Sequence, residues 1–200
     1  MDIKYYLKLK VRSLRYFIRS IQIKYKINAN HGKVLGKVRF LVDGEFVFGS
    51  DIMISGNGID NLNCSQIAVS RGAKLTIGDK SGCSQTSIYC KTSITIGNYV
   101  NIGAGSLIID SDFHSLYWKH HENRGVDAIN AKSLPVIIND YVFIGARTII
   151  CKGVTIGARS IIAAGSVVNK NIPDDCIAGG NPCKIIKYIE NSQDYHVDRV

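Results

Sequence analysis

Three of the five histidines, His114, His120 and His121, lie within one short stretch that also contains the only tryptophan, Trp118. An imidazole with an unperturbed pKa of about 6.5 can accept and return a proton at neutral pH, and this is what a general base requires. The first of these histidines ends the sequence "DSDFH" at positions 110 to 114. The question is which elements hold it in place.

A repeat of six residues surrounds this stretch. Aliphatic residues recur every six positions, and a small or turn-tolerant residue follows each of them, at Ile138, Ile144, Ile150, Ile156, Ile162 and Val168. The same register precedes the histidines at Ile96, Ile102 and Ile108. A helix repeats near 3.6 residues and a strand near 2, so a strict six predicts short strands that alternate with identical corners.

Three such hexads form one triangular coil, and stacked coils bury a continuous aliphatic column. The sequence therefore predicts an all-β solenoid, a parallel β-helix. Between Ile108 and Ile138 lie 30 residues where one repeat would use six, so 24 extra residues must leave the coil. We expect residues 110–135 to form a protruding loop, and such excursions from a regular scaffold are often functional.

The segments "ITIGNYVNIGAG", "DSDFH", "VFIGARTIICKGVTIGARSIIAAGSVVNKNIP" and "IAGGNPCKII" resemble the hexapeptide-repeat acyltransferases. The resemblance is to the branch of maltose and galactoside O-acetyltransferases, and above all to the acetyltransferases of colanic acid and capsular polysaccharide. It implies a left-handed β-helix, a homotrimer, and transfer of acetyl from acetyl-CoA to a sugar hydroxyl. It leaves open N-acyl transfer to an amino sugar, acetylation of a xenobiotic, or a catalytically silent binding module.

The resemblance places the catalytic base at His114, with His120 and His121 as less favoured alternatives. Asp112 is either the residue that orients the histidine, a ligand of the acceptor, or a turn former. Trp118 either stacks on a sugar ring or packs on a neighbouring subunit. Two residues of the less regular early coils, Ser84 and Tyr89, are further candidates for contacts with the acceptor.

The same resemblance implies where the coenzyme would lie, along the groove between adjacent subunits. The residues that match its contact positions are Ala146, Ala164, Asn169, Lys170, Lys184 and Lys187. The amide of Ala146 is also a candidate oxyanion donor. Lysines stand at 184 and 187 where the family often has arginines, so the charge is retained and the bidentate geometry is lost.

The N-terminal segment carries most of the excess positive charge. Residues 1–26 hold eight Lys and Arg residues against Asp2, which is +7 of the total of +9. At 100° per residue, Ile3, Leu7, Val11, Leu14, Ile18 and Ile21 share one helical stripe. This basic amphipathic helix predicts either contact with an anionic membrane or packing on the main domain. No nucleic-acid-binding motif accompanies the charge.

We therefore expect a basic N-terminal segment at 1–30, a β-helix at 31–190 whose residues 171–190 form a short C-terminal cap, and a tail at 191–200. The six cysteines lack paired CxxC spacing, and no secretory signal is recognisable. These features favour a cytoplasmic protein with reduced thiols, peripheral on the membrane if the helix binds it. The histidines cluster in one loop rather than across coils, so no metal site is expected.

Overall fold

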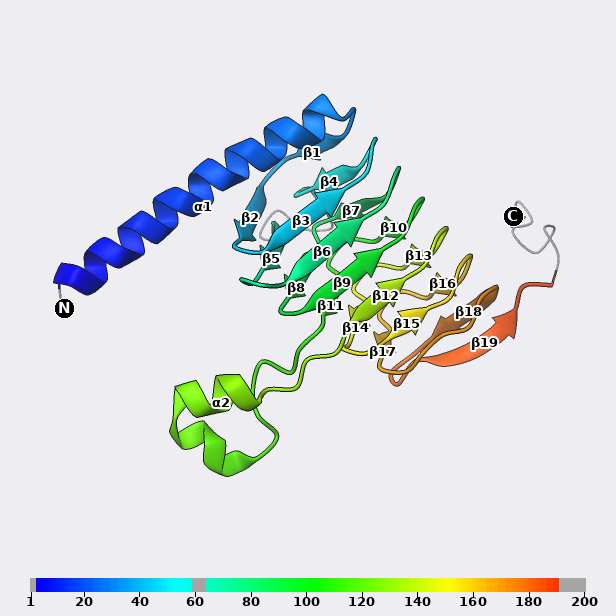
Figure 1. The fold of residues 1–200 in the computed structure, drawn as a ribbon. Helices are drawn as coiled ribbons and strands as arrows, with labels where there is room; N and C mark the ends of the chain where they lie inside the picture. Colours follow the sequence, from blue (N-terminus) through cyan, green and yellow to red (C-terminus); the bar gives the residue numbers. More distant parts are fainter. Residues whose placement is uncertain (1–2, 59–63, 191–200) are drawn as a thin grey trace.

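The computed structural model describes residues 3–58 and 64–190, and the predicted tail 191–200 lies outside them. The chain begins with helix α1 (Ile3–Ala29) and then winds into a column of stacked triangular coils (Figure 1). Each coil contributes one strand to each of three sheets, as the six-residue repeat predicts. The architecture is a left-handed parallel β-helix of hexapeptide repeats.

Eight strands of the described chain form the first sheet, here called sheet A. Its order is β1 (Lys33–Leu35), β4 (Met53–Ser55), β7 (Gly82–Ser84), β10 (Asn101–Ile102), β13 (Phe143–Ile144), β16 (Ile161–Ile162), β18 (Cys176–Gly179) and β19 (Lys184–Tyr188). The neighbours in this sheet are parallel except β18 and β19, which are antiparallel. The predicted C-terminal cap is thus a strand that reverses direction at the end of sheet A.

The other two sheets complete the triangle. Sheet B consists of β2 (Val38–Val42), β5 (Ser65–Val69), β8 (Ser87–Cys90), β11 (Leu107–Ile109), β14 (Ile149–Ile150) and β17 (Val167–Val168). Sheet C consists of β3 (Glu45–Phe48), β6 (Lys74–Ile77), β9 (Ser93–Ile96), β12 (Val136–Ile138) and β15 (Thr155–Ile156). All pairs within these two sheets are parallel.

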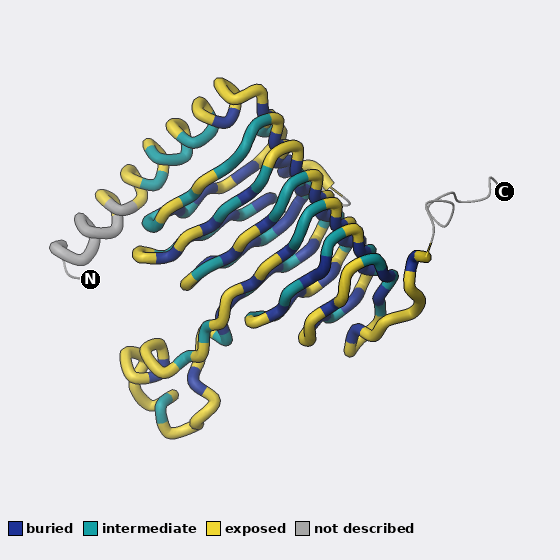
Figure 2. Tube along the Cα trace, turned by 45° about the vertical axis from the view of Figure 1, so that its right-hand side comes forward, coloured by how far each residue is buried: buried dark blue, intermediate teal, exposed yellow. Residues whose placement is uncertain are grey.

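The repeated aliphatic residues fill the centre of the column. Ile108 is in register with Ile88 on one side and Ile150 on the other, so equivalent side chains stack along the axis. Each of them is fully buried, as are the isoleucines at 138, 144, 156 and 162. Figure 2 shows this alternation of a buried interior with exposed corners. Burial of one such side chain contributes about 1.5–3 kcal/mol, so the column is the main source of stability.

The corners require very small residues where successive coils touch. A Cβ added to Gly145 would lie 2.4 Å from the backbone nitrogen of Ala164 in the next coil. No side chain fits at that distance without moving the backbone. The "IGA" segment at this corner is therefore dictated by the coil spacing of about 4.8 Å.

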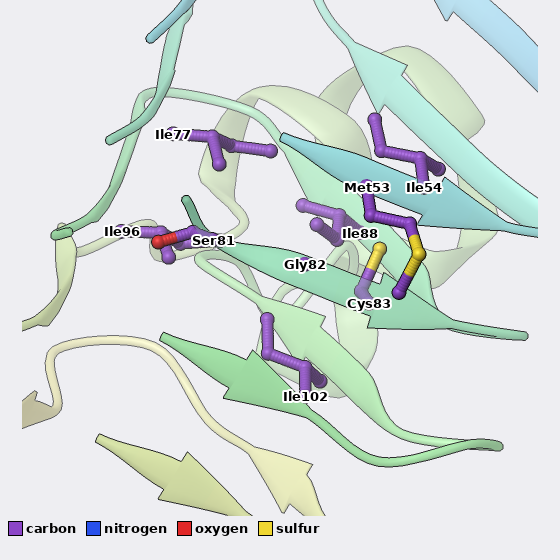
Figure 3. A pocket seen from close by; sticks show the side chains of 9 residues that line it. All are labelled: Met53, Ile54, Ile77, Ser81, Gly82, Cys83, Ile88, Ile96 and Ile102. Carbon is purple, nitrogen blue, oxygen red and sulfur yellow. The ribbon is translucent and has the colours of Figure 1, made fainter. Parts of the chain in front are cut away.

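A small void lies inside the column among coils two to four. Its volume is about 10 Å³, and its lining is mainly apolar, with Met53, Ile88, Ile102 and Cys83 around it (Figure 3). A ligand site needs roughly 300 Å³ or more, so this void is a packing defect. Burial raises the pKa of the Cys83 thiol to about 12, which leaves it protonated and unreactive.

Helix α1 lies across the first coil and covers part of the N-terminal end of the column (Figure 1). Ile27 is fully buried there, and Ile23 packs against the core. Tyr16 donates a hydrogen bond of 2.6 Å to Asp43, and Arg19 donates to the carbonyl of Val42. The C-terminal half of the helix is thus fixed to the β-helix. The helices of the described chain are too short or too polar to cross a membrane.

Candidate active site

The chain leaves the column after β11 and returns at β12 through a narrow neck. Ser111 and Ser133 form an antiparallel bridge, and the amide of Asp112 donates to the carbonyl of Lys132 at 2.9 Å. The loop therefore starts and ends at one point on the edge between sheets B and C. Beyond the neck it contains the 3-10 helix η1 (Trp118–Glu122) and helix α2 (Arg124–Asn130), which project from the column (Figure 1).

The root of the loop is fixed by the carboxylate of Asp110, which is completely buried. It accepts hydrogen bonds from the backbone amides of Lys91 (2.7 Å), Thr92 (2.7 Å) and Ser93 (2.8 Å) in the coil below, and from the Thr92 hydroxyl (3.0 Å). Charge-assisted bonds of this kind are about twice as strong as neutral ones. The first residue of "DSDFH" therefore joins the loop to the rigid scaffold.

The turn that follows directs the histidine outward. Phe113 has a φ of +61°, a left-handed conformation that costs a non-glycine residue about 1–2 kcal/mol. Its amide donates to the Ser111 hydroxyl at 3.1 Å, and its ring meets that of Tyr89 edge-on with the centroids 6.0 Å apart. Phe113, which precedes His114, is thus fixed by its hydrogen bond to Ser111 and by its ring contact with Tyr89.

His114 is paired with a carboxylate from within the loop. Its Nδ1 lies 2.6 Å from Asp127 Oδ2 on α2, and Asp127 Oδ1 accepts a bond of 2.7 Å from the amide of Ser115. The Asp127 side chain is only 10% exposed, whereas the His114 side chain is 74% exposed. The hydrogen bond from His114, followed by that from the Ser115 amide, lowers the pKa of Asp127 below its usual value. This carboxylate is therefore ionised at neutral pH.

This geometry leaves one ring nitrogen available for proton transfer. An ionised carboxylate only accepts hydrogen bonds, so Nδ1 of His114 must carry the proton that faces Asp127. Nε2 then has a free lone pair, and it makes no hydrogen bond within residues 3–58 and 64–190. A buried carboxylate that fixes the tautomer of an exposed imidazole is the arrangement of a general base and its positioning group.

The two other histidines of the loop stabilise its shape. His120 Nδ1 lies 2.9 Å from the Ser115 hydroxyl, and His121 Nε2 lies 2.8 Å from the Ser115 carbonyl. His121 is also 3.7 Å from Asp127 Oδ1, which is longer than the contact of His114. Of the three histidines, His114 therefore has the strongest contact with the carboxylate.

Asp127 is a functional candidate that the sequence analysis missed, and Asp112 does not orient the histidine as one alternative proposed. Asp112 instead forms an ion pair of 2.7 Å with Lys152, which follows β14 on the same edge of the column. The second carboxylate oxygen of Asp112 is buried and has no hydrogen-bond partner in the described chain. A ligand role for Asp112 stays a prediction. The sequence carries a signal only for the helix that holds Asp127, because Asn123 is a favourable N-cap residue for it.

The predicted coenzyme contacts at Ala146 and Ala164 lie on another edge, between sheets A and B. Their backbone amides have no acceptor within the described residues, whereas two corner amides on the edge between sheets C and A are satisfied by side chains. There, Asn98 and Ala158 donate to the side chains of Asp140 (2.7 Å) and Asp174 (2.9 Å). The corners at 146 and 164 therefore offer donors to a ligand that lies along this edge.

The remaining predicted coenzyme residues are dispersed. Asn169 and Lys170 are exposed after β17, on the edge that also carries the loop, whereas Lys184 and Lys187 are exposed on β19. One chain thus presents its candidate base and its free corner amides on different edges. A single subunit does not bring these two parts of the site together.

The predicted acceptor residues have different surroundings. Tyr89 lines an open groove with Cys64, Ser87 and Leu107, and its hydroxyl accepts a hydrogen bond of 2.8 Å from Gln66. Ser84 is one strand away on β7 and does not line that groove. Trp118 is exposed on η1 with Lys119 above its ring. Of the three, Tyr89 is the residue whose side chain contacts the "DSDFH" turn, through the ring of Phe113.

No cluster of His, Cys, Asp and Glu with metal-binding geometry occurs in the described part of the chain. The described cysteines are unpaired thiols, and burial raises the pKa of those at 83, 90, 151, 176 and 183. In the described part of the chain, the candidate reactive side chains are thus histidines and carboxylates.

For the acyl transfer that the sequence resemblance implies, we expect replacement of Asp127 by Asn to lower the turnover number by about 10- to 100-fold, less than loss of the base itself. The amide can offer its NH2 group toward Nδ1, which favours the wrong tautomer of His114. The pKa of Asp127 is lower in the folded protein than in the unfolded chain. Its ionic contribution to loop stability is therefore fully present at pH values above the pKa of the unfolded chain, and it is lost as the pH falls through the pKa of the folded protein. The wild-type protein should therefore keep this contact at all pH values above about 4.

The measurement is the dependence of kcat and KM on pH for wild type, Asp127→Asn and Asp127→Glu. A positioning role predicts a lower kcat with a nearly unchanged KM for the acyl donor, and partial recovery with glutamate. Equal turnover of the asparagine variant and the wild type would contradict this role.

Known proteins match the chain in both its repeats and its wider sequence. The family described as bacterial transferase hexapeptide (six repeats) matches residues 135–170. Galactoside O-acetyltransferase of Escherichia coli K12 is 35% identical over 151 residues, which is 76% of this chain and 60% of the relative. Polysialic acid O-acetyltransferase of Escherichia coli O1:K1 is 39% identical over 124 residues, 60% of this chain and 38% of the relative.

A solved structure agrees with these matches. The maltose O-acetyltransferase of Clostridium difficile 630 superimposes with a TM-score of 0.51 at 27% identity, and the match covers 76% of this chain and 71% of that one. The fold and the repeats thus define a hexapeptide-repeat β-helix protein. In sequence, the chain is similar to the hexapeptide transferase family model and to proteins named as O-acetyltransferases. The chain spans 60% and 38% of the two curated relatives.

Proposed function

We propose that the protein is an O-acetyltransferase that moves the acetyl group of acetyl-CoA to a hydroxyl of a sugar. The observation that carries the proposal is the His114–Asp127 pair, with one imidazole nitrogen fixed by a carboxylate and the other open to solvent. The relatives named for galactoside, polysialic acid and maltose O-acetylation support the reaction class and a saccharide acceptor.

The reaction follows from these groups. The acceptor oxygen attacks the thioester carbonyl carbon while Nε2 of His114 takes the hydroxyl proton, and a tetrahedral oxyanion forms. A free corner amide such as that of Ala146 would donate a hydrogen bond to this oxyanion. Collapse of the intermediate breaks the carbon–sulfur bond, and the imidazolium returns its proton to the leaving thiolate. The products are the O-acetyl sugar and free coenzyme A, and Asp127 remains ionised throughout.

The active unit in this proposal is a homotrimer. The loop with His114 leaves the edge between sheets B and C, whereas the open amides of Ala146 and Ala164 line the edge between sheets A and B. A neighbouring subunit would bring its amide-lined edge against the histidine loop and form a groove for acetyl-CoA. Lys170 on the loop edge and Lys184 and Lys187 on β19 would then meet the phosphates.

The acceptor in this proposal is part of a surface polysaccharide or a lipid-linked saccharide precursor, and the reaction takes place on the cytoplasmic side. The groove beside Tyr89 is near the "DSDFH" turn and would receive part of the sugar. Asp112, Ser84 and Trp118 are weaker candidates for acceptor contacts, because none of them is held against His114.

The test is the release of free thiol from acetyl-CoA by the full-length protein with a panel of sugars, amino sugars and polysaccharides. Wild type and His114→Ala are compared at equal concentrations. The proposal predicts acceptor-dependent thiol release that requires His114, with an ester product by mass spectrometry. An amide product would assign N-acyl transfer instead, and no His114-dependent release with any acceptor would overturn the enzymatic function.

Replacement of Lys170 by Ala should raise the KM for acetyl-CoA by about fivefold and leave kcat nearly unchanged, because an exposed ion pair contributes up to about 1 kcal/mol. The effect should shrink at high ionic strength. The control is Lys33→Ala on β1, an exposed lysine at the opposite end of the column. Identical KM values for the Lys170 and Lys33 variants would remove Lys170 from the coenzyme site.

A further inference from the structure

Helix α1 carries apolar side chains on two opposite faces. Ile23 and Ile27 pack against the β-helix. Leu14 and Ile18 precede them by nine residues each, and nine residues at about 100° per residue bring a side chain to the opposite side of a helix. Accordingly, Leu14 is 59% exposed and Ile18 is 47% exposed. The amphipathic stripe seen in the sequence is therefore not the surface that packs on the domain.

The outward stripe is long and contiguous. Val11, Leu14, Ile18, Ile21 and Tyr25 are all exposed and follow one another at helical spacing along α1. The side chains of Ile3 and Leu7, which the sequence analysis placed on the same stripe, lie outside the described residues. Figure 2 shows that α1 is largely exposed along its length. An apolar stripe on such a helix is a surface that usually has a partner.

Basic residues flank this stripe and indicate the charge of that partner. The segment 1–26 has a net charge of +7, and its cations include Lys10, Arg15, Lys24 and Lys26 in the described part of the helix. Arg15 also contacts Asp43 of the β-helix at 3.4 Å. An exposed apolar stripe beside many cations is the pattern of a helix that lies in the plane of an anionic membrane.

We propose that α1 docks the protein on an anionic lipid surface through the face formed by Val11, Leu14, Ile18, Ile21 and Tyr25. The apolar side chains enter the boundary between headgroups and acyl chains, and the flanking cations meet lipid phosphates. The opposite face stays on the first coil through Ile23, Ile27 and the hydrogen bond from Tyr16 to Asp43. One helix thus joins the membrane to the β-helix.

This docking bears on the acceptor of the proposed reaction. A β-helix held at a lipid surface by α1 has lipid-linked saccharides within its reach, which favours an acceptor of that kind. This part of the inference rests on the proposed acetyl transfer, whereas lipid binding itself does not depend on that reaction.

The experiment is co-sedimentation of the full-length protein with vesicles of phosphatidylcholine alone and with vesicles that also contain phosphatidylglycerol. The wild type should sediment with the anionic vesicles and be released by high salt. The double variant Leu14→Ser/Ile18→Ser should lower the partition coefficient by about tenfold or more. The matched control is Gln22→Ser/Asn28→Ser, which places the same residue at two exposed polar positions of α1.

The outcomes are separable from folding and from catalysis. Both double variants should keep the wild-type melting temperature, because the altered side chains do not pack on the β-helix. Equal sedimentation of the two variants, or equal binding to neutral and anionic vesicles, would overturn the proposal. A change of molar mass caused by Leu14→Ser/Ile18→Ser without lipid would assign the stripe to a second copy of the chain. Thiol release with a soluble acceptor should stay at the wild-type rate in every variant.

Discussion

Replacement of His114 by Ala should lower kcat for acetyl transfer by about 10²- to 10⁴-fold, the range typical for loss of a general base. The KM for acetyl-CoA should change little, because the imidazole acts on the acceptor hydroxyl. The melting temperature should also stay within a few degrees, since the side chain is 74% exposed and mainly contacts Asp127. Steady-state thiol release and thermal unfolding measure these quantities on the same preparations.

Two further variants distinguish proton transfer from loop structure. His114→Gln can still donate a hydrogen bond to Asp127 but cannot act as a base, so it should be as inactive as the alanine variant. His120→Ala removes a histidine of the same loop that bonds Ser115 rather than Asp127, and it should retain activity within a few-fold. If His114→Gln is active and His120→Ala is not, the base is misassigned.

Replacement of Asp110 by Ala should destabilise the protein by about 3–5 kcal/mol, the largest structural effect we expect from a single polar residue. The change leaves three backbone amides and one hydroxyl of the coil below without their acceptor, and each buried unpaired group costs about 1–3 kcal/mol. For a chain of this size, the melting temperature should fall by roughly 8–15 °C.

The measurement is thermal and urea unfolding followed by circular dichroism. Asp174→Ala is the matched control, because that aspartate is exposed and accepts a bond from the single amide of Ala158. Its effect should stay below about 1 kcal/mol. Asp110→Asn should be intermediate, since its amide oxygen replaces only one of the two acceptors. Comparable losses in the two alanine variants would show that the buried network does not fix the root of the loop.

The regular part of the fold is predictable because a physical constraint repeats. The isoleucines at 138, 144, 150, 156 and 162 must each point into a narrow column, and each corner glycine such as Gly145 must fit against the next coil. The break in that register locates the loop with its three histidines, and the resemblance to hexapeptide-repeat acyltransferases favours His114 among them. The first coils were harder to assign, because β2 and β5 are five-residue strands that do not follow the hexad spacing.

The partner of the histidine was not predictable from spacing within the repeat. Asp127 lies 13 residues after His114, and the two meet only because η1 and α2 fold the loop back on itself. Asp112, two residues before the histidine, was the nearer candidate in sequence, but it faces Lys152 of the next coil. Likewise, one hydrophobic stripe was evident in the N-terminal segment, and the structure shows that a second face packs on the domain.

The narrow neck of the loop bears on how proteins of this architecture diversify. The segment between β11 and β12 leaves and re-enters at the Ser111–Ser133 bridge, and β12 still pairs with β9 and β15 in regular register. A replacement segment needs only to match two adjacent anchor points, and the entropy of closing a longer segment rises slowly with its length. Selection can therefore exchange the loop segment on an unchanged β-helix, so that a new surface beside the column arises without a new fold.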